Sequence, residues 1–187
     1  MQKYFIIIFC GFLQFGFSQS TYTNLEDALK KPESVKFLSL TKKKLKHFPS
    51  EVLKFYNLEY LDLSKNKLIS IPDTLRYLEK LKTLVLDNNK LTAISTGITS
   101  LPNLEELHLA RNPIVEVPKH IANLKTLAVF DCWLCHVKDL PEEMEALKNI
   151  KEIDLRQTYI REQDSDIYNE WWPDAKIQTT WGCNCGK

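Results

Sequence analysis

The hydrophobic positions of this chain recur every 23 residues between residues 35 and 160. In each copy an apolar residue is followed three and five positions later by two more, and this alternation predicts a short strand with its apolar side chains on one face. Six stacked copies would pair these strands into a parallel sheet over a continuous core. The three columns are Val35, Leu58, Leu81, Leu104, Leu127 and Ile150; Leu38, Leu61, Leu84, Leu107, Phe130 and Ile153; and Leu40, Leu63, Leu86, Leu109, Cys132 and Leu155.

A polar column follows each predicted strand. Asn66, Asn89 and Asn112 occupy it in the central copies, Cys135 and Thr158 replace asparagine later, and Lys44 departs from the pattern in the first copy. Where the backbone turns inward after a strand, its amide and carbonyl groups lack partners, and a buried side-chain amide can satisfy both kinds of group. We therefore expect these asparagines to point into the core and stabilise the turns.

These columns together resemble the leucine-rich-repeat family in its short, 23-residue form known from secreted bacterial proteins, L-x-x-L-x-L-x-x-N-x-L-x-x-I-P. The resemblance covers residues 35–160 as six repeats. It implies an α/β solenoid of right-handed superhelical coils, with a parallel β-sheet on the concave face and helical caps at both ends. Prolines late in the repeats, such as Pro49 and Pro72, favour an extended, non-helical convex side.

Both ends of such a solenoid need covering because the terminal coils would otherwise expose their cores. Residues 19–34 predict an N-terminal cap helix that starts at Asn24 and is halted by Pro32. Residues 161–187 predict a C-terminal cap: a helix from Glu162 to Trp172, an edge strand from Lys176 to Thr179, and a cysteine-containing tail.

Residues 1–18 have the layout of a signal peptide. The apolar run from Tyr4 to Phe17 is shorter than the roughly 20 residues that span a bilayer, and the small residues Gly16 and Ser18 predict cleavage before Gln19. A lipoprotein anchored through Cys10 and an uncleaved anchor are the alternatives. We expect a secreted or periplasmic (cell-envelope) monomer that meets the membrane only through this segment during export.

Charge and composition narrow the partners. Without Lys3 the chain carries 24 basic and 24 acidic residues, so nucleic acid is not expected as a partner. The charge is uneven, because residues 30–54 carry eight Lys and two Glu while residues 139–174 carry eleven acids and four bases. Beyond residue 18 only Gly97, Gly182 and Gly186 are glycine, which excludes a glycine-rich nucleotide loop. No cofactor is expected.

Two constellations leave an enzyme or a thiol or metal protein as the alternative. His108 and Asp131 occupy the same outward column in adjacent repeats, but a hydrolase would need a nucleophile beside this pair. Cys132 and Cys135 form a C-x-x-C that could act with Cys183 and Cys185, although both occupy inward columns, which favours buried thiols.

The resemblance and the outward positions together predict a non-enzymatic protein that binds a protein ligand on its concave sheet. Trp133 is the predicted centre, with the Arg156 guanidinium over its ring and a shallow space beside it at Ala110. Asp131 should keep His108 protonated to higher pH than a free imidazole, so binding could change near neutrality. The predicted partner-binding residues are Tyr60, Val85, Asp87, His108, Arg111, Val129, Asp131, Trp133, Asp154 and Arg156.

Overall fold

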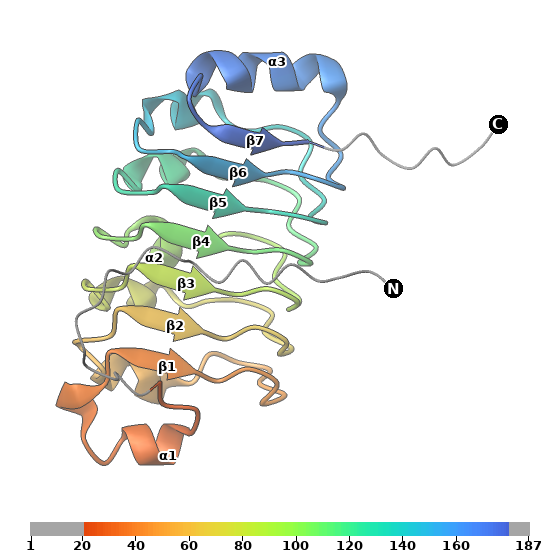
Figure 1. Cartoon of the computed structure of the whole chain (residues 1–187). Helices are drawn as coiled ribbons and strands as arrows, with labels where there is room; N and C mark the ends of the chain where they lie inside the picture. Colours follow the sequence, from red (N-terminus) through yellow and green to blue (C-terminus); the bar gives the residue numbers. More distant parts are fainter. Residues whose placement is uncertain (1–20, 180–187) are drawn as a thin grey trace, which may run out of the picture.

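A computed structural model describes residues 21–179, with the side chains of 162–165 left out of the description. Seven three-residue strands form one parallel sheet in sequence order, confirming the predicted solenoid. Figure 1 shows the coils stacked along one axis, with all strands on the same side. The strands are β1 (Phe37–Ser39), β2 (Tyr60–Asp62), β3 (Thr83–Val85), β4 (Glu106–His108), β5 (Val129–Asp131), β6 (Glu152–Asp154) and β7 (Lys176–Gln178).

The sheet register follows the repeat. Leu38 pairs with Leu61, and Leu61 with Leu84, each one repeat further along the chain. The central residue of each of these strands is fully buried and its two neighbours are partly exposed. The leucine columns therefore form a single core between the sheet and the opposite side of the coils, because alternate side chains of a strand point to opposite faces.

The opposite side is helical, so the expected extended conformation is wrong. It carries 3₁₀ helices η2 (Ser50–Lys54), η3 (Asp73–Tyr77), η4 (Lys119–Asn123) and η5 (Glu142–Ala146), and the short helix α2 (Thr96–Thr99). Each 3₁₀ helix follows a proline whose carbonyl accepts a hydrogen bond from the amide three residues later, as Pro72 does from Leu75 at 3.1 Å. The fixed φ of proline suits this tight turn, so proline starts these helices.

Gly97 in α2 shows how closely adjacent coils approach on this side. A Cβ at position 97 would lie 2.3 Å from the Pro72 carbonyl oxygen and 2.8 Å from the Asp73 Cα. Both are backbone atoms of the preceding coil, which cannot move aside like a flexible side chain. Only glycine fits here without displacing the coil.

The asparagine column is buried as expected. The Asn89 amide nitrogen donates to the carbonyls of Leu63 and Leu86 at 3.0 and 2.8 Å, and its Oδ1 accepts from the Leu68 amide at 3.0 Å. Asn66 and Asn112 repeat this arrangement one coil on either side. The side chains thus link consecutive coils along the core.

The first repeat corrects the expected register of this column. Left-handed backbone conformations recur every 23 residues at Lys42, Lys65, Asn88, Arg111, Leu134 and Gln157. The next residue after Lys42, Lys43, is therefore in line with Asn66, and Lys44 lies one position further on, itself with a φ of 61°. Lys43 is exposed, so the inward asparagine column begins at Asn66.

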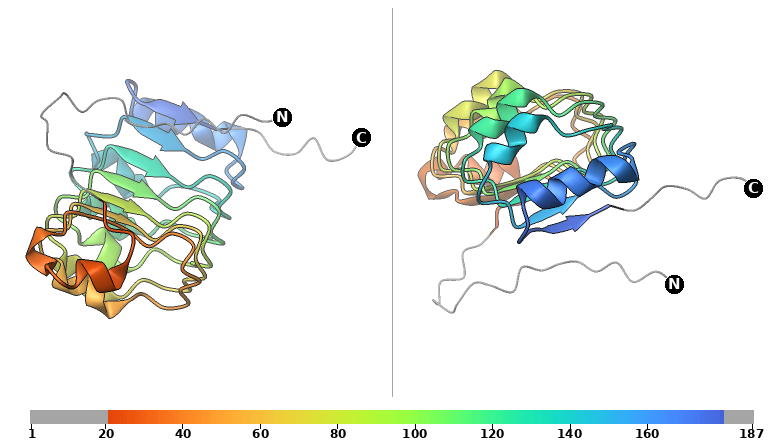
Figure 2. Two further views of the ribbon diagram at one scale, coloured as in Figure 1. Left: turned by 60° about the horizontal axis from the view of Figure 1, so that its bottom comes forward. Right: turned by 90° about the horizontal axis from the view of Figure 1, so that it is seen from above.

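Both described ends of the solenoid are covered. At the N-terminal end, Asn24 Oδ1 accepts from the Glu26 amide at 2.8 Å and caps α1 (Leu25–Ala28), which is followed by η1 (Pro32–Ser34). At the other end α3 (Glu162–Trp171) lies across the last coil, as Figure 2 shows. The buried Trp172 indole donates to the Leu147 carbonyl at 2.9 Å and joins this cap to the last repeats.

Candidate interaction surface on the outer face of the sheet

The outer face of the sheet carries the side chains that alternate with the buried leucines. Among the predicted binding residues, Tyr60, Val85, Asp87, His108, Val129, Asp131, Trp133 and Arg156 are partly exposed here, and Arg111 is exposed beside them. Asp154 is only 9% exposed. The sheet therefore brings these residues onto one surface, and Asp154 lies mostly beneath it.

Several aspartates on this face support the strand ends. Asp62, Asp131 and Asp154 each accept a hydrogen bond from the amide two residues later, at 2.8, 2.9 and 3.0 Å. Asp87 instead accepts from the Ala110 amide of the next repeat at 3.0 Å. A carboxylate that caps a backbone amide has a structural role in addition to any role in binding.

The partner of Trp133 differs from the prediction. The Arg111 guanidinium carbon lies 4.5 Å from the centre of the Trp133 ring, a cation–π contact. Arg156, the expected partner, instead forms a forked pair with Asp154, its Nε lying 2.9 and 3.0 Å from the two carboxylate oxygens. A bidentate carboxylate pair holds the guanidinium more strongly than an aromatic face does, and Asp154 is on the same strand end.

The space expected beside the indole is also closed. Ala110 is only 5% exposed, although it occupies an outward column of the repeat. The Arg111 amide donates to the Trp133 carbonyl at 2.7 Å, which brings the two residues together across the coils. The exposed part of this site is thus the Arg111–Trp133 pair itself.

His108 lies between two carboxylates. Its Nδ1 is 3.7 Å from Asp131 Oδ2 and its Nε2 is 3.8 Å from Glu106 Oε2. Burial alone would lower the pKa of His108, but Asp131 and Glu106, with Asp87 nearby, raise the pKa to about 10. The predicted direction is correct, and His108 is a cation at neutral pH. The contact with His108 in turn lowers the pKa of Glu106.

Asp87 has a carboxyl pKa that is raised toward neutrality. Burial, followed by the negative charge of Asp131, raises the pKa of Asp87 to about 6, although His108 opposes the shift. The expected pH response of His108 near neutrality is therefore wrong, because its pKa is too high, and Asp87 is the better candidate for such a response. Nearby, burial and then Asp62 raise the pKa of the Tyr60 phenol to about 12, so it stays neutral.

The carboxylates of this face differ in their cationic partners. Asp131 and Glu106 face His108, Asp154 pairs with Arg156, and Glu152 pairs with Lys176 at 2.9 Å. Asp62 accepts hydrogen bonds from the hydroxyls of Ser39 and Thr41, and within residues 21–179 neither Asp62 nor Asp87 forms a salt bridge. Negative charge without a bonded cation is therefore concentrated over β2 and β3.

The arrangement of the described residues does not favour a reactive thiol or a metal site. Cys132 and Cys135 are buried free thiols, and Cys135 together with burial raises the pKa of Cys132 well above its usual range, the opposite of an activated thiol. Cys183 and Cys185, like the expected signal peptide, lie outside the described residues. Over the described part of the chain no group of histidine, cysteine, aspartate and glutamate has the arrangement of a metal site.

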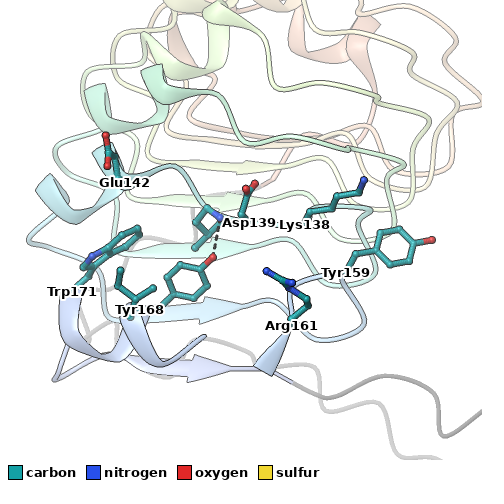
Figure 3. Close-up of a pocket in the computed structure, with 9 residues that line it drawn as sticks. Lys138, Asp139, Glu142, Tyr159, Arg161, Tyr168 and Trp171 are labelled. Atoms are coloured by element: carbon teal, nitrogen blue, oxygen red, sulfur yellow. Dashed lines mark hydrogen bonds between the residues drawn. The ribbon is translucent and has the colours of Figure 1, made fainter. Parts of the chain in front are cut away.

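A hollow of roughly 730 Å³ beneath the C-terminal cap was not foreseen from the sequence. Figure 3 shows Tyr168 at its centre, with Arg161 and Tyr159 on one side and Trp171 on the other. The Tyr168 hydroxyl accepts a hydrogen bond from the Leu140 amide at 2.9 Å. The hollow is formed by α3 and two separate coils, and only the aromatic composition near the C-terminus could have suggested it.

No helix within residues 21–179 reaches the length and apolarity needed to cross a membrane. A comparison with curated protein sequences gives no match. Two family models do match, "Leucine rich repeat" over residues 33–91 and "Leucine Rich repeats (2 copies)" over residues 79–126. Such repeats typically form protein–protein interaction modules.

Solved structures agree with the family models. A leucine-rich-repeat protein of Leptospira interrogans is 28% identical with a TM-score of 0.63, and the match covers 80% of this chain and 44% of that one. Internalin C2 of Listeria monocytogenes is 24% identical with a TM-score of 0.65, covering 86% and 67%.

The leucine-rich-repeat ectodomain of the plant membrane receptor kinase GASSHO1/SCHENGEN3 from Arabidopsis thaliana, solved in complex with CASPARIAN STRIP INTEGRITY FACTOR 2, is 23% identical with a TM-score of 0.59, covering 68% and 16%. This chain thus spans less than half of the Leptospira and plant proteins. From the sheet, the asparagine column and the two family models, we conclude that the chain is built from leucine-rich repeats.

Proposed function

We propose that this chain is an exported, monomeric, non-enzymatic protein of the cell envelope or extracellular space that binds a protein partner on the outer face of its sheet. The single observation that carries the proposal is the Arg111–Trp133 pair on that face. Tryptophan and arginine provide most of the binding energy in protein interfaces when a partner covers them. A ring already held by a cation loses less conformational freedom on binding.

The charges around this pair suggest what the partner presents. Asp62 and Asp87 lie on one side of Trp133 along the sheet, beside Tyr60 and Val85. A lysine or arginine of the partner placed over β2 and β3 would supply the cation that these carboxylates lack among the described residues. An apolar group of the same partner would cover the indole.

A binding role also fits the chemistry of the face better than catalysis does. His108 is a cation fixed between two carboxylates, so it is poorly suited to accept a proton at neutral pH. The complex of the plant receptor ectodomain supports the general role, because that protein was solved in complex with CASPARIAN STRIP INTEGRITY FACTOR 2. The signal-peptide layout of residues 1–18 supports the proposed export.

The test is affinity capture from culture fluid and envelope extract, with wild-type protein and Trp133→Ala as parallel baits. Trp133→Ala should weaken binding of the captured partner by about 2 kcal/mol or more, the range of an interface anchor. Calorimetry with the identified partner gives the affinity of each variant. A partner bound equally by wild type and Trp133→Ala would contradict the proposed site.

Tyr77→Ala is the matched control. Tyr77 is 59% exposed on η3, away from the outer face of the sheet, and Arg76 lies 5.2 Å from its ring centre. The control thus removes an aromatic residue with the same kind of arginine contact from another surface. It should leave the partner's affinity within about 0.5 kcal/mol of wild type, as surface substitutions usually do.

A further inference from the structure

The loops that follow the first three strands form an edge whose charged residues are all lysine. These residues are Lys42, Lys43, Lys44, Lys46, Lys65, Lys67 and Lys90, which we call the lysine edge, and all are exposed. The loop segments 41–49, 64–72 and 88–95 contain no aspartate or glutamate. In Figure 1 these loops lie at the arrowhead ends of β1, β2 and β3.

The repeat holds these lysines in register. The Lys42 amide donates to the Ser64 carbonyl at 3.2 Å and the Lys65 amide to the Asp87 carbonyl at 2.8 Å, one repeat further along. Lys67 and Lys90 bond the preceding coil in the same way, through the Leu45 and Leu68 carbonyls. Lysines of adjacent coils are therefore stacked at roughly the 4.8 Å spacing of neighbouring strands, close enough for their charges to repel.

Several lysines elsewhere in the structure are paired with a carboxylate. Lys36 is 3.0 Å from Glu59, Lys119 is 2.9 Å from Glu143, and Lys176 is 2.9 Å from Glu152. In contrast, none of the seven lysines of the edge forms a salt bridge with any carboxylate in the part of the chain that the structure describes. An anionic surface would relieve the repulsion that the fold itself leaves in place.

Apolar side chains on the same edge indicate which anionic surface fits. Ile69 is 53% exposed and follows Lys67, in the column that Lys46 occupies one repeat earlier. Further along the edge Val115, Leu134 and Tyr159 are 60%, 42% and 62% exposed. A soluble polyanion gains nothing from an exposed isoleucine, whereas a lipid surface accepts apolar side chains between its headgroups.

We propose that the lysine edge docks this protein onto a bilayer surface rich in anionic phospholipid headgroups, with Ile69 entering the headgroup layer. This surface is separate from the outer face of the sheet and the inference does not depend on the proposed partner site. Trp133 is uncharged and belongs to the fifth repeat, whereas the lysine edge lies in the first three repeats. Trp133→Ala should therefore leave vesicle binding unchanged.

The test is co-sedimentation of the full-length protein with vesicles of phosphatidylcholine alone and with about one third phosphatidylglycerol. Any binding through the apolar segment 4–17 is measured by the neutral vesicles. The wild type should bind the anionic vesicles more strongly, and the difference should vanish near 1 M salt, where charges are screened beyond about 3 Å. Equal binding to both vesicle types would overturn the proposal.

Lys44→Gln, Lys46→Gln, Lys67→Gln and Lys90→Gln combined in one variant should reduce binding to anionic vesicles by roughly a hundredfold. The matched control replaces Lys54, Lys125, Lys148 and Lys151, which are exposed on other surfaces, and changes the net charge equally. The control should lose less than about threefold, because its charges do not face the headgroups. Circular dichroism before sedimentation verifies that both variants are folded, and equal losses in the two would contradict docking by this edge.

Ile69→Ser tests the lipid component. Ile69→Ser should reduce binding to anionic vesicles severalfold without changing the binding of soluble heparin. Ile167→Ser, the same substitution at an exposed position of α3, should change neither vesicle binding nor heparin binding. Strong heparin binding by a wild type that ignores anionic vesicles would show that the edge recognises a soluble polyanion, and the membrane proposal would be wrong.

Discussion

The inner and outer sides of the same strands obey different constraints. Inside, one arrangement repeats in successive coils: Asn66, Asn89 and Asn112 form the same hydrogen bonds, and leucine fills the same columns. Outside, no two strands carry the same set, and a His–Asp pair lies beside a Trp–Arg pair. Stacking requires the inside to repeat, because each coil packs only on its neighbours, but leaves the outside free to vary.

Replacing Asn89 should give the largest loss of folding stability, because it interrupts the hydrogen bonds by which the buried asparagines link consecutive coils. Asn89→Ala leaves the buried Leu68 amide without its partner, at about 1–3 kcal/mol, and removes one of the two side-chain donors to the Leu63 and Leu86 carbonyls, at about 0.5–1.5 kcal/mol for each lost hydrogen bond. We expect a loss of about 3 kcal/mol or more in the free energy of unfolding, measured by urea denaturation. Asn123→Ala, an exposed asparagine on η4, serves as control and should change the unfolding free energy by less than about 0.5 kcal/mol.

The packing between coils provides the next test. Gly97→Ala would place a Cβ against the Pro72 and Asp73 backbone, and we expect a loss of about 1–3 kcal/mol, typical of overpacking. Thermal unfolding followed by circular dichroism measures it. Ala93→Ser, at an exposed position of the same repeat, is the control. An unchanged melting temperature for Gly97→Ala would mean that the coils are farther apart than the structure shows.

The contribution of the outer face to folding stability should instead depend on pH. The raised pKa of Asp87 contributes stability that is present below its unfolded pKa of 3.8 and is lost as pH rises through about 6, where the folded carboxyl ionises. Asp87→Asn keeps the oxygen that accepts from the Ala110 amide but removes the charge. The variant should therefore gain stability relative to wild type between pH 4 and pH 7, by about 2 kcal/mol. A constant difference in unfolding free energy across this range would contradict the buried carboxylate.

The contribution of His108 to folding stability should change over a higher pH range. Its raised pKa contributes stability that is fully present below pH 6.5 and is lost as pH rises through about 10. Titration of the imidazole by NMR should show a protonated ring at pH 8, and Asp131→Asn should move that titration to lower pH. A wild-type imidazole that is neutral at pH 8 would show that the two carboxylates do not hold it as described.

Trp133→Ala should have the smallest effect on folding and so separates the outer face from the inner one. The ring contacts Arg111 on the surface and is not part of the buried core. We expect the free energy of unfolding to fall by less than about 1 kcal/mol, since only a surface contact is lost. A loss comparable to that of Asn89→Ala would make Trp133 a packing residue and remove the main support for the proposed partner site.

From the sequence we could predict the repeat, the inward columns, the strands and both caps. These follow from periodicity: a leucine every 23 residues can be buried in only one stacking arrangement, and the alternation within L-x-L sets which neighbours face outward. The outward position of most of the predicted binding residues follows from the same rule. In the first repeat the predicted alignment is wrong by one residue, because three consecutive lysines do not show which position is in line with Asn66.

The pairing of the outward side chains, in contrast, could not be predicted without the folded structure. Arg111 and Arg156 both belong to repeats next to that of Trp133. Arg111 contacts the Trp133 ring, whereas Arg156 binds the Asp154 carboxylate, because a bidentate hydrogen-bonded ion pair is stronger than a cation–π contact. Asp87 acquired its pKa near 6 from burial and from Asp131, a residue 44 positions away in the chain. Periodicity specifies which residues are neighbours, but long flexible side chains and local burial choose among those neighbours, and that choice depends on every group on the face at once.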